Sequence, residues 1–253
     1  MHLHRTTQGD GAETVLVHGF TQTSASWTPI LDLVGPVGRR TAVDLPGHGW
    51  SGALRADLWR TGDLLADVAG GGKATFVGYS LGGRCCLHLA LAHPASVERL
   101  VLVGATGGIE DADERAQREA RDRALADRIE QIGVEAFLDE WLAQPLFAGL
   151  TAEAAGREER LVNTPEGLAA SLRLCGTGTQ EPLWDRLPEV TCPVLLVAGE
   201  QDERFLAHAQ RMAELLPDAA AVIIPGAGHA VHLEAPMDFV TAWRAWEREV
   251  LSR

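Results

Sequence analysis

Short runs of Val, Leu, Ile and Ala recur along the chain without the polar alternation that marks a strand with one face in water. Strands that are buried on both faces of a parallel sheet have this composition. Longer stretches with helical spacing lie between the runs, and they supply the crossovers that parallel strands require. The predicted strands are residues 14–17, 41–44, 74–78, 100–103, 194–198 and 221–224. We therefore expect an α/β fold in which helices flank a mostly parallel central sheet.

The interval from residue 104 to residue 193 departs from this alternation of strands and helices, because it holds no strand-like run. A structureless loop of that length is implausible in a compact domain. Helical patterns fill the interval instead, at residues 113–131, 134–142, 152–161 and 165–174. We predict a helical cap at residues 106–185, inserted into a core domain that is formed by residues 1–105 and 186–253.

The pentapeptide GYSLG at residues 78–82 lies between a predicted strand and an Ala- and Leu-rich helical stretch. Glycines at its first and last positions permit a tight strand-to-helix turn that exposes the serine hydroxyl at the edge of the sheet. The N-terminus of the following helix can stabilise developing negative charge. In this context the motif predicts a nucleophile elbow at Ser80 rather than an incidental glycine turn.

A serine hydroxyl needs a histidine, itself oriented by a carboxylate, before it can act as a base or a nucleophile. Asp202 and His229 each follow a predicted strand, and the chain order is then serine, acid, histidine. Positions after strands favour these two residues. Asp202 could instead cap the next helix. The alternatives are Glu200 or Glu203 as the acid and His232 as the histidine.

An oxyanion hole needs two backbone N–H groups that point at one oxygen. The N–H of Leu81 follows the nucleophile, and the second should come from Phe20 in the loop after the first predicted strand. We expect His18 to brace that loop, and His48, in another turn after a strand, to be structural.

The motifs follow the order of the α/β-hydrolase fold superfamily, which the chain resembles over essentially its whole length. A closer resemblance is to the 2-succinyl-6-hydroxy-2,4-cyclohexadiene-1-carboxylate synthases of menaquinone biosynthesis. The residues that carry it are HGFTQTSASW (18–27), GYSLGGR (78–84), ERAQREARDRALADRIE (114–130) and FLDEWLAQPLFAGL (137–150). The N-terminus is short for the eight-stranded sheet of the superfamily, so we expect one edge strand to be missing or shortened.

The resemblance implies a lyase that needs no cofactor. In this family a Ser–His–Asp triad acts without an acyl-enzyme: it removes a proton from the substrate, and pyruvate is eliminated while the ring system rearranges. Carried over by position, the base system is Ser80, His229 and Asp202. The implied substrate-binding residues are Arg84, Arg118 and Trp141, which would bind carboxylates, and Tyr79 beside the nucleophile.

Arg84 also has a physical interpretation of its own. It lies one helical turn after Ser80 and so within reach of the same pocket, where a guanidinium can hold a carboxylate in bidentate geometry. The arginines of residues 110–130 are interleaved with acids, so most of them should form a solvated ion-pair face. Arg118 is singled out because it matches the family's position. Trp141 could equally pack the cap against the core.

Other functions share most of these motifs. A serine hydrolase would act on small esters, thioesters or lactones through an acyl-enzyme on Ser80, and Arg84 would then be structural or select an acidic acyl group. A non-catalytic binding module would use the cap cavity as a receptor, but the intact triad argues against it. A haloalkane dehalogenase needs a carboxylate where Ser80 stands.

The net charge of −13, from 22 basic and 35 acidic residues, argues against nucleic-acid binding, which needs a positive footprint. It also argues against docking on an anionic membrane. Any positive field for a small substrate rich in carboxylates must therefore come from a few arginines that are turned inward.

Compartment signals are few. No apolar run approaches the roughly 18 residues of a spanning helix, and the first residues lack the pattern of a signal peptide. Four cysteines without a CxxC indicate buried thiols in a reduced cytosol, so we expect a cytoplasmic protein. Nine histidines show no strong metal-ligand spacing, since the HxxH of residues 229–232 alone is weak. We expect no metal site.

Overall fold

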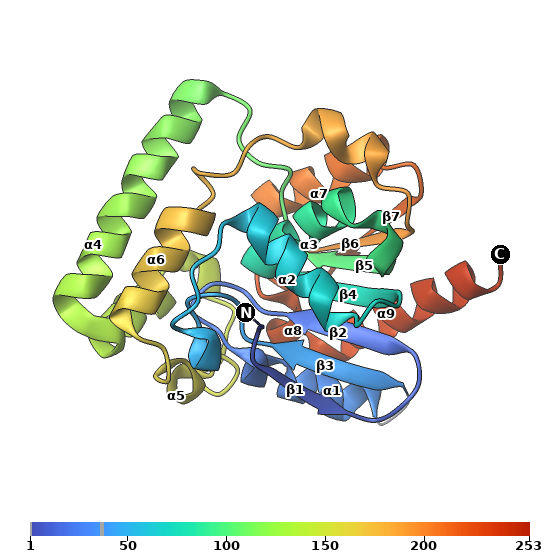
Figure 1. Cartoon of the computed structure of the whole chain (residues 1–253), viewed down its shortest axis with the longest axis horizontal. Coiled ribbons are helices and arrows are strands. Elements are labelled where there is room, and N and C mark those ends of the chain that lie inside the picture. The colour runs from blue at the N-terminus through green and yellow to red at the C-terminus, as the bar shows by residue number, and fades with distance from the viewer. Residues whose placement is uncertain (1, 36–37) are drawn as a thin grey trace.

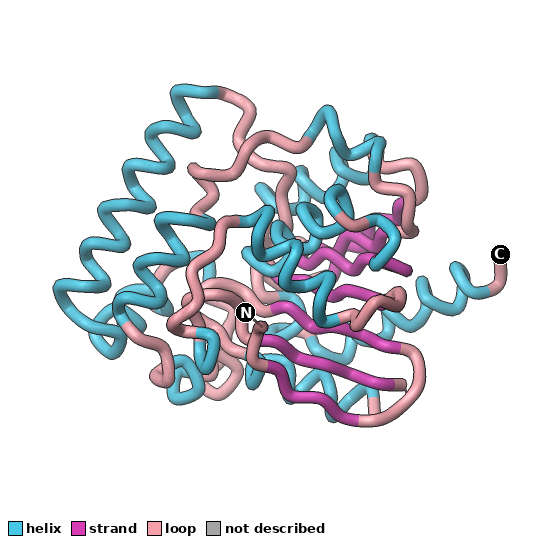
Figure 2. The backbone as a smooth tube through the Cα atoms, in the orientation of Figure 1, coloured by secondary structure: helices cyan, strands magenta, loops and turns pink. Residues whose placement is uncertain are grey.

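The computed structural model describes residues 2–35 and 38–253. Its strands are β1 (Arg5–Gln8), β2 (Glu13–Val17), β3 (Arg39–Val43), β4 (Ala74–Tyr79), β5 (Val97–Val103), β6 (Val194–Gly199) and β7 (Ala219–Ile224). They form one sheet in the order β1-β3-β2-β4-β5-β6-β7 (Figures 1 and 2). The β1–β3 pair is antiparallel and all the other pairs are parallel. The expected mostly parallel sheet is confirmed.

The six predicted strands are all present, with small shifts at their ends. Both faces of β4 and β6 are buried throughout, as the apolar runs indicated. That interpretation is wrong for β7, which lies at the edge of the sheet and has mostly half-buried side chains. β1 is not predicted, because its sequence RTTQ is polar and exposed. The described part of the chain has seven strands, one fewer than the superfamily's eight.

Helices cover both faces of the sheet (Figure 1). One face carries α2 (Leu58–Val68), α3 (Leu81–Ala92) and α7 (Glu203–Leu215), and the other carries α1 (Thr28–Val34), α8 (Val231–Glu234) and α9 (Pro236–Leu251). Because side chains alternate along a strand, β2 sends Val15 and Val17 to the first core and Leu16 to the second. Short 3-10 helices span Ser24–Trp27, Gly49–Ser51, Pro94–Ser96, Pro145–Phe147 and Trp184–Glu189.

Between β5 and β6 the chain forms α4 (Ala112–Leu142), α5 (Arg157–Arg160) and α6 (Pro165–Cys175), which lie to one side of the sheet (Figure 1). The predicted helices 113–131 and 134–142 are both present, joined at a kink at Gly133. The predicted helix 152–161 is wrong over most of its length, because only the turn α5 is helical there. α4 and α6 share a separate apolar core that includes the buried Ile129, Phe137 and Leu168.

The strands β2, β4, β6 and β7 run in the same direction, so the loops that follow them meet at one edge of the sheet. These loops carry the His18–Phe20 turn, Ser80, Asp202 and His229. Residues of α4 and α6 line a cavity at this same edge. The fold therefore brings the motifs and the inserted helices to one place.

Candidate active site

Ser80 forms the turn between β4 and α3 with φ 51° and ψ −107°, a backbone conformation that side-chain-bearing residues rarely adopt. The glycines on either side are required because main chains approach closely. A Cβ on Gly78 would lie 2.6 Å from the carbonyl oxygen of Gly82, and a Cβ on Gly82 would lie 2.2 Å from that of Val17. The N–H of Ser80 donates to the carbonyl oxygen of Val103 in β5 at 2.8 Å. This is the geometry of a nucleophile elbow.

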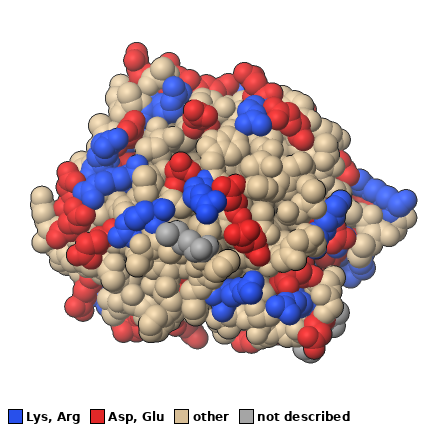
Figure 3. Space-filling view, viewed as in Figure 1, with Lys and Arg blue, Asp and Glu red and all other residues tan. Residues whose placement is uncertain are grey.

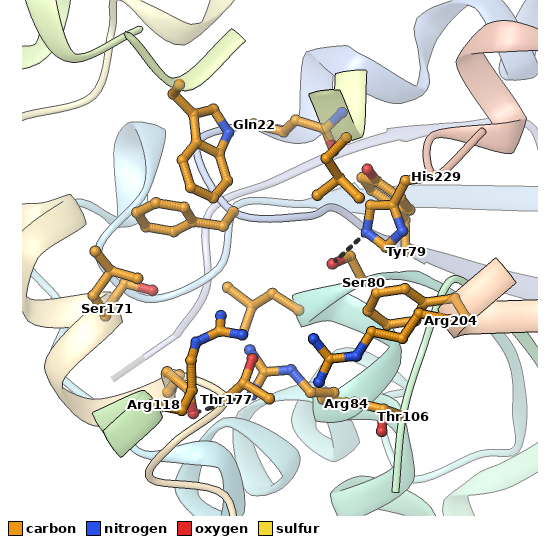
Figure 4. Close-up of a pocket in the computed structure, with 18 of the residues that line it drawn as sticks. Gln22, Tyr79, Ser80, Arg84, Thr106, Arg118, Ser171, Thr177, Arg204 and His229 are labelled. Atoms are coloured by element: carbon orange, nitrogen blue, oxygen red, sulfur yellow. Dashed lines mark hydrogen bonds between the residues drawn. The ribbon is translucent and has the colours of Figure 1, made fainter. Parts of the chain in front are cut away.

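His229 bridges Ser80 and Asp202 (Figure 4). Its Nδ1 lies 2.7 Å from Asp202 Oδ2, and its Nε2 lies 3.1 Å from Ser80 Oγ. With the proton on Nδ1, the ring donates to the carboxylate and accepts from the serine hydroxyl. The side chains of His229 and Asp202 are only 3% and 9% exposed, which shields this pair from water. The arrangement can accept a proton from Ser80 and stabilise the resulting imidazolium.

The alternative acids lie elsewhere. Asp202 Oδ1 accepts weakly from the N–H of Phe205 at 3.4 Å, so Asp202 caps α7 and also holds His229. Glu200 instead accepts the N–H of Gly226 at 2.9 Å. Glu203 is exposed in the first turn of α7.

His232, the alternative histidine, lies behind Tyr79 rather than beside Ser80. Its ring is fully buried, with centroid distances of 4.6 Å to Trp27 and 4.4 Å to Tyr79. Within residues 2–35 and 38–253 neither ring nitrogen has a hydrogen-bond partner. Burial lowers the pKa of His232 to about 3, so the ring is neutral at physiological pH.

The loop after β2 is held by its own side chains. His18 Nδ1 lies 2.7 Å from the carbonyl oxygen of Gly19, and its Nε2 accepts the N–H of Leu45 at 3.0 Å. Burial lowers the pKa of His18 to about 4. Gln22 accepts the N–H of Gly19 at 2.9 Å. The loop thereby places Phe20 in the wall of the cavity.

Leu81, whose N–H was the first predicted oxyanion donor, begins α3 directly after Ser80 and lines the same cavity. His48 lies away from that wall, fully buried with its ring 4.9 Å from that of His18. Burial lowers the pKa of His48 to about 3, in keeping with a structural role.

A cavity of about 310 Å³ opens between the sheet edge and the inserted helices (Figure 4). It brings together every residue that the sequence predicted for the site. These are Phe20, Tyr79, Ser80, Leu81, Arg84, Arg118, Trp141, Asp202 and His229. A cavity of this size accommodates a small organic molecule.

Arg84 reaches the cavity from the second turn of α3 and is 7% exposed. Its Nη1 lies 3.4 Å from both the carbonyl oxygen of Gly176 and Oε1 of Gln180. Gln180 in turn donates to the carbonyl oxygen of Thr106 at 3.3 Å. Burial lowers the pKa of Arg84 below its usual value, but a guanidinium stays charged in proteins. The segment 176–184, in which the sequence shows nothing diagnostic, therefore positions a cation in the cavity.

Arg118 projects from α4 into the cavity, with a third of its side chain exposed. Its Nε donates to Asp122 Oδ1 at 2.8 Å, and Asp122 Oδ2 accepts the N–H of Gly178 at 3.1 Å. Asp122 is itself buried. The carboxylate thus fixes the guanidinium of Arg118 and ties α4 to the segment that also holds Arg84.

Two of the other four arginines of α4, Arg123 and Arg128, form the ion pairs that the charge pattern indicated, whereas Arg115 donates to main-chain carbonyl oxygens. Basic and acidic side chains alternate over the surface that α4 occupies (Figure 3). Arg123 pairs with Glu119 at 2.6 Å, and Arg128 pairs with Glu140 at 2.6 Å. These contacts are exposed and form the solvated ion-pair face that was predicted.

Aromatic rings form the remaining wall. Trp141 packs edge to face against Phe20 at 5.2 Å and lies 5.5 Å from Phe147, between ring centroids. Its Nε1 is buried without a hydrogen-bond partner in the described part of the chain, which leaves a donor available to a ligand. Tyr79 is 3% exposed and its ring lies 5.3 Å from His229. Trp141 therefore packs and also offers a polar atom.

Two arginines that line the cavity, Arg160 and Arg204, were not identified from the sequence. Arg160 is 3% exposed and donates to the hydroxyl of Thr21 and to the carbonyl oxygen of Ala155. Burial lowers its pKa to about 10, so it remains charged near neutral pH. Its signal is hidden in the charged run REER, which looks like an exposed helix. Arg204, two residues after Asp202, could have been found from that proximity.

The described residues contain no group of three or more His, Cys, Asp or Glu side chains that could hold a metal ion. Over the same residues, no helix is both long and apolar enough to cross a membrane. The four cysteines are free thiols, three of them buried.

Comparisons with known proteins agree with this geometry. The profile of the alpha/beta hydrolase family matches residues 14–243. A Bacillus subtilis protein provisionally named 2-succinyl-6-hydroxy-2,4-cyclohexadiene-1-carboxylate synthase is 40% identical, with 89% of this chain and 86% of that protein covered. The synthase of that name from Escherichia coli O1:K1 is 32% identical, with 90% of each chain covered.

Among solved structures, MenH from S. aureus superposes with a TM-score of 0.91 at 30% identity, and covers 97% of this chain and 98% of its own. The likeness therefore extends over both the sheet and the inserted helices. The chain belongs to the alpha/beta hydrolase family and, within it, to the 2-succinyl-6-hydroxy-2,4-cyclohexadiene-1-carboxylate synthases.

Proposed function

We propose that this protein is a cofactor-independent carbon–oxygen lyase of menaquinone biosynthesis. It eliminates pyruvate from a carboxylate-bearing cyclohexene precursor and leaves the cyclohexadiene for which its relatives are named. The observation that carries the proposal is the pair of guanidinium groups, on Arg84 and Arg118, that line the cavity of Ser80 in a chain of net charge −13. Such a site favours a polyanion over a neutral ester.

The reaction begins with proton removal by Ser80. As its oxygen takes a proton from the ring, the serine proton passes to Nε2 of His229, and the carboxylate of Asp202 stabilises the imidazolium. The electron pair of the broken C–H bond forms a ring double bond, the existing double bond shifts, and the C–O bond to the pyruvyl group breaks. The leaving enolate takes up the proton that His229 holds and becomes pyruvate, which returns the triad to its starting protonation state. No water is consumed.

The other residues of the site bind the substrate and stabilise the negative charge that develops on it. The N–H groups of Phe20 and Leu81 face the oxygen on which negative charge develops. Arg84 and Arg118 hold substrate carboxylates, Trp141 donates from its unpartnered Nε1, and Tyr79 fixes the ring of His229 by packing. Residues 106–185 act as a cap that excludes water. Free thiols are consistent with a cytoplasmic location.

Incubation with the pyruvate-bearing cyclohexene precursor tests the proposal. The wild type should release pyruvate, as read by a coupled dehydrogenase assay. Ser80→Ala should lower the rate about 10³-fold, and Arg84→Ala about 10²-fold in kcat/KM, because it removes a buried carboxylate partner. Arg121→Ala, which removes an exposed arginine of α4, should leave the rate unchanged. A wild type that releases no pyruvate contradicts the proposal.

The rival serine hydrolase uses the same triad through an acyl-enzyme. It predicts rapid turnover of short p-nitrophenyl esters with a burst that equals the enzyme concentration. The lyase proposal predicts slow ester turnover without a burst. Labelling of Ser80 by a fluorophosphonate would not separate the two, because an activated serine reacts in either case.

A further inference from the structure

Arg204 lies in the first turn of α7, two residues after Asp202, and its side chain lines the active-site cavity. Figure 4 shows it extending toward the space below Ser80, on the side opposite Arg118. Unlike Arg84, it is an exposed residue. The cavity thus has one guanidinium at its open side in addition to those in its interior.

Neither the helix dipole nor an ion pair accounts for an arginine at this position. A cation in the first turn of a helix faces the positive end of the helix dipole, which is unfavourable. Arg211, on the same helix, pairs with Glu110 at 2.5 Å. In the described part of the chain, no carboxylate lies within ion-pair distance, 4.0 Å, of the guanidinium nitrogens of Arg204. Its charge is available to a ligand.

The other cavity arginines are more constrained. Arg160 is buried, and two of its nitrogens donate to the hydroxyl of Thr21 and to the carbonyl oxygen of Ala155. Arg118 is held by Asp122, and Arg84 by Gln180 and a carbonyl oxygen. Arg84 and Arg118 still face the cavity. Four guanidinium groups thus line the cavity, and Arg160 has two of its three nitrogens engaged. Arg84 and Arg118 have one engaged each and Arg204 has none among the described residues, so these three have the most capacity left for a ligand.

The substrate of the proposed function carries the same number of carboxylates. The name of its ring product contains two, one on the ring and one on the succinyl group, and the eliminated pyruvate contains the third. We propose that Arg204 binds the carboxylate of the pyruvyl group, whereas Arg84 and Arg118 bind the two that remain on the ring product. The leaving group must exit to solvent, and Arg204 is the exposed member of the three. This inference rests on the proposed function.

Kinetics of Arg204→Ala and Arg204→Lys test the assignment, with inhibition by pyruvate and by purified ring product measured separately. Arg204→Ala should raise the KM about 10- to 100-fold and weaken inhibition by pyruvate to a similar extent, because a charged hydrogen bond to the carboxylate is lost. The inhibition constant of the ring product should stay within about twofold of the wild type. Arg204→Lys should recover part of the loss. Arg248→Ala removes an exposed arginine of α9 and the same charge, and should change none of these values.

Three results would overturn the inference. Unchanged KM and pyruvate inhibition in Arg204→Ala would show that Arg204 binds no carboxylate. Equal weakening of inhibition by pyruvate and by ring product would show that it does not single out the leaving group. A similar effect of Arg248→Ala would mean that net charge alone is responsible. In all three cases the wild type still releases pyruvate, whereas a wild type that releases none refutes the proposed function itself.

Discussion

At the residue scale, the turn at Ser80 depends on Gly78 and Gly82. At either position the side chain of another residue would collide with neighbouring main-chain atoms. The main chain of Gly82 touches the carbonyl oxygen of Val17, and Ser80 holds a strained φ of 51° between two such contacts. The strain persists because the strands β2 and β5 fix the backbone on both sides. The hydroxyl is thereby presented to His229 rather than to the helix that follows.

Gly82→Ala should therefore damage both fold and function. Its Cβ would meet a carbonyl oxygen at 2.2 Å, so β2 and α3 must move apart. We expect a loss of about 1–3 kcal/mol in the free energy of unfolding, as for other overpacked sites, and at least a tenfold loss of activity. Denaturant unfolding measures the first quantity. Gly72→Ala is the matched control, because its Cβ would lie at an ordinary 3.5 Å from Ala69. Equal stability of the two variants would contradict the interpretation.

Asp122 is a positioning residue for Arg118. Asp122→Asn keeps the shape but removes the charge that fixes the guanidinium, and it turns an amide toward the N–H of Gly178. We expect the KM to rise about tenfold with little change in kcat, and the free energy of unfolding to fall by about 1–3 kcal/mol. Asp127→Asn, on the exposed side of α4, is the control. An unchanged KM in Asp122→Asn would show that Arg118 needs no such support.

The residues of the site differ in how far the sequence could predict them. Ser80, Asp202 and His229 were predictable because a motif and a place after a strand identify them. Asp122 and Gln180 were not, since neither lines the cavity and each contacts a residue distant in the chain. Asp122 accepts from Gly178, 56 residues away, and Gln180 accepts from Arg84, 96 residues away. Arg160 was hidden because burial of a charged run depends on tertiary packing. Spacing along a chain carries no such information.

At the element scale, α4 owes its shape to Gly133. This residue has φ 77° and ψ 170°, a region open almost only to glycine, and no atom lies within 4 Å of where its Cβ would stand. The kink therefore reflects backbone conformation rather than crowding. It places Arg118, before the kink, and Trp141, after it, in the wall of one cavity.

Gly133→Ala should impose a backbone cost of about 1–3 kcal/mol or straighten the helix. Either change moves Trp141 relative to Arg118, so we expect the KM to rise while the triad, and hence kcat, is less affected. Steady-state kinetics and urea unfolding report the two effects. Gln131→Ala, at an exposed neighbouring position, should change neither the KM nor the free energy of unfolding. A variant with wild-type KM and stability would show that the kink has no role.

The elements of the core were predictable because their apolar runs are buried on both faces. β1 was not, since RTTQ has neither apolar residues nor alternation, and its pairing with β3 alone makes it a strand. The helix expected at 152–161 fails for a different reason. Its residues have helical composition, but Gly156 takes a left-handed conformation that stops the helix from extending toward its N-terminus. β1 therefore depends on pairing with a distant strand, whereas the predicted helix is cut short by the backbone conformation of one of its own residues.

At the scale of the whole molecule, buried neutral histidines make stability depend on pH. Burial lowers the pKa of His18 and His88 to about 4 and of His48 and His232 to about 3. The unfolded chain binds protons on these groups near pH 6.5, so the unfolded state is favoured as the pH falls from there toward 4. Each histidine adds up to about 1.4 kcal/mol per pH unit to that loss.

Urea unfolding at pH 7, 6 and 5 should therefore show a falling free energy of unfolding. His232→Leu removes one titrating ring and two unpartnered nitrogens. It should be at least as stable as the wild type at pH 7 and should lose stability less steeply with acid, by up to about 1.4 kcal/mol per pH unit. It should also keep its activity, unlike His229→Ala. An acid slope equal to that of the wild type would contradict the assignment.

The whole molecule is acidic, yet four of its arginines line one cavity together with Ser80. Elimination and hydrolysis of the pyruvyl group both release pyruvate, but only elimination creates a second ring double bond. The most direct test follows pyruvate and the absorbance of the conjugated diene in one reaction of the wild-type enzyme with the cyclohexene precursor. The account predicts one diene for each pyruvate, with both lost in Ser80→Ala. Pyruvate released without the diene would contradict it.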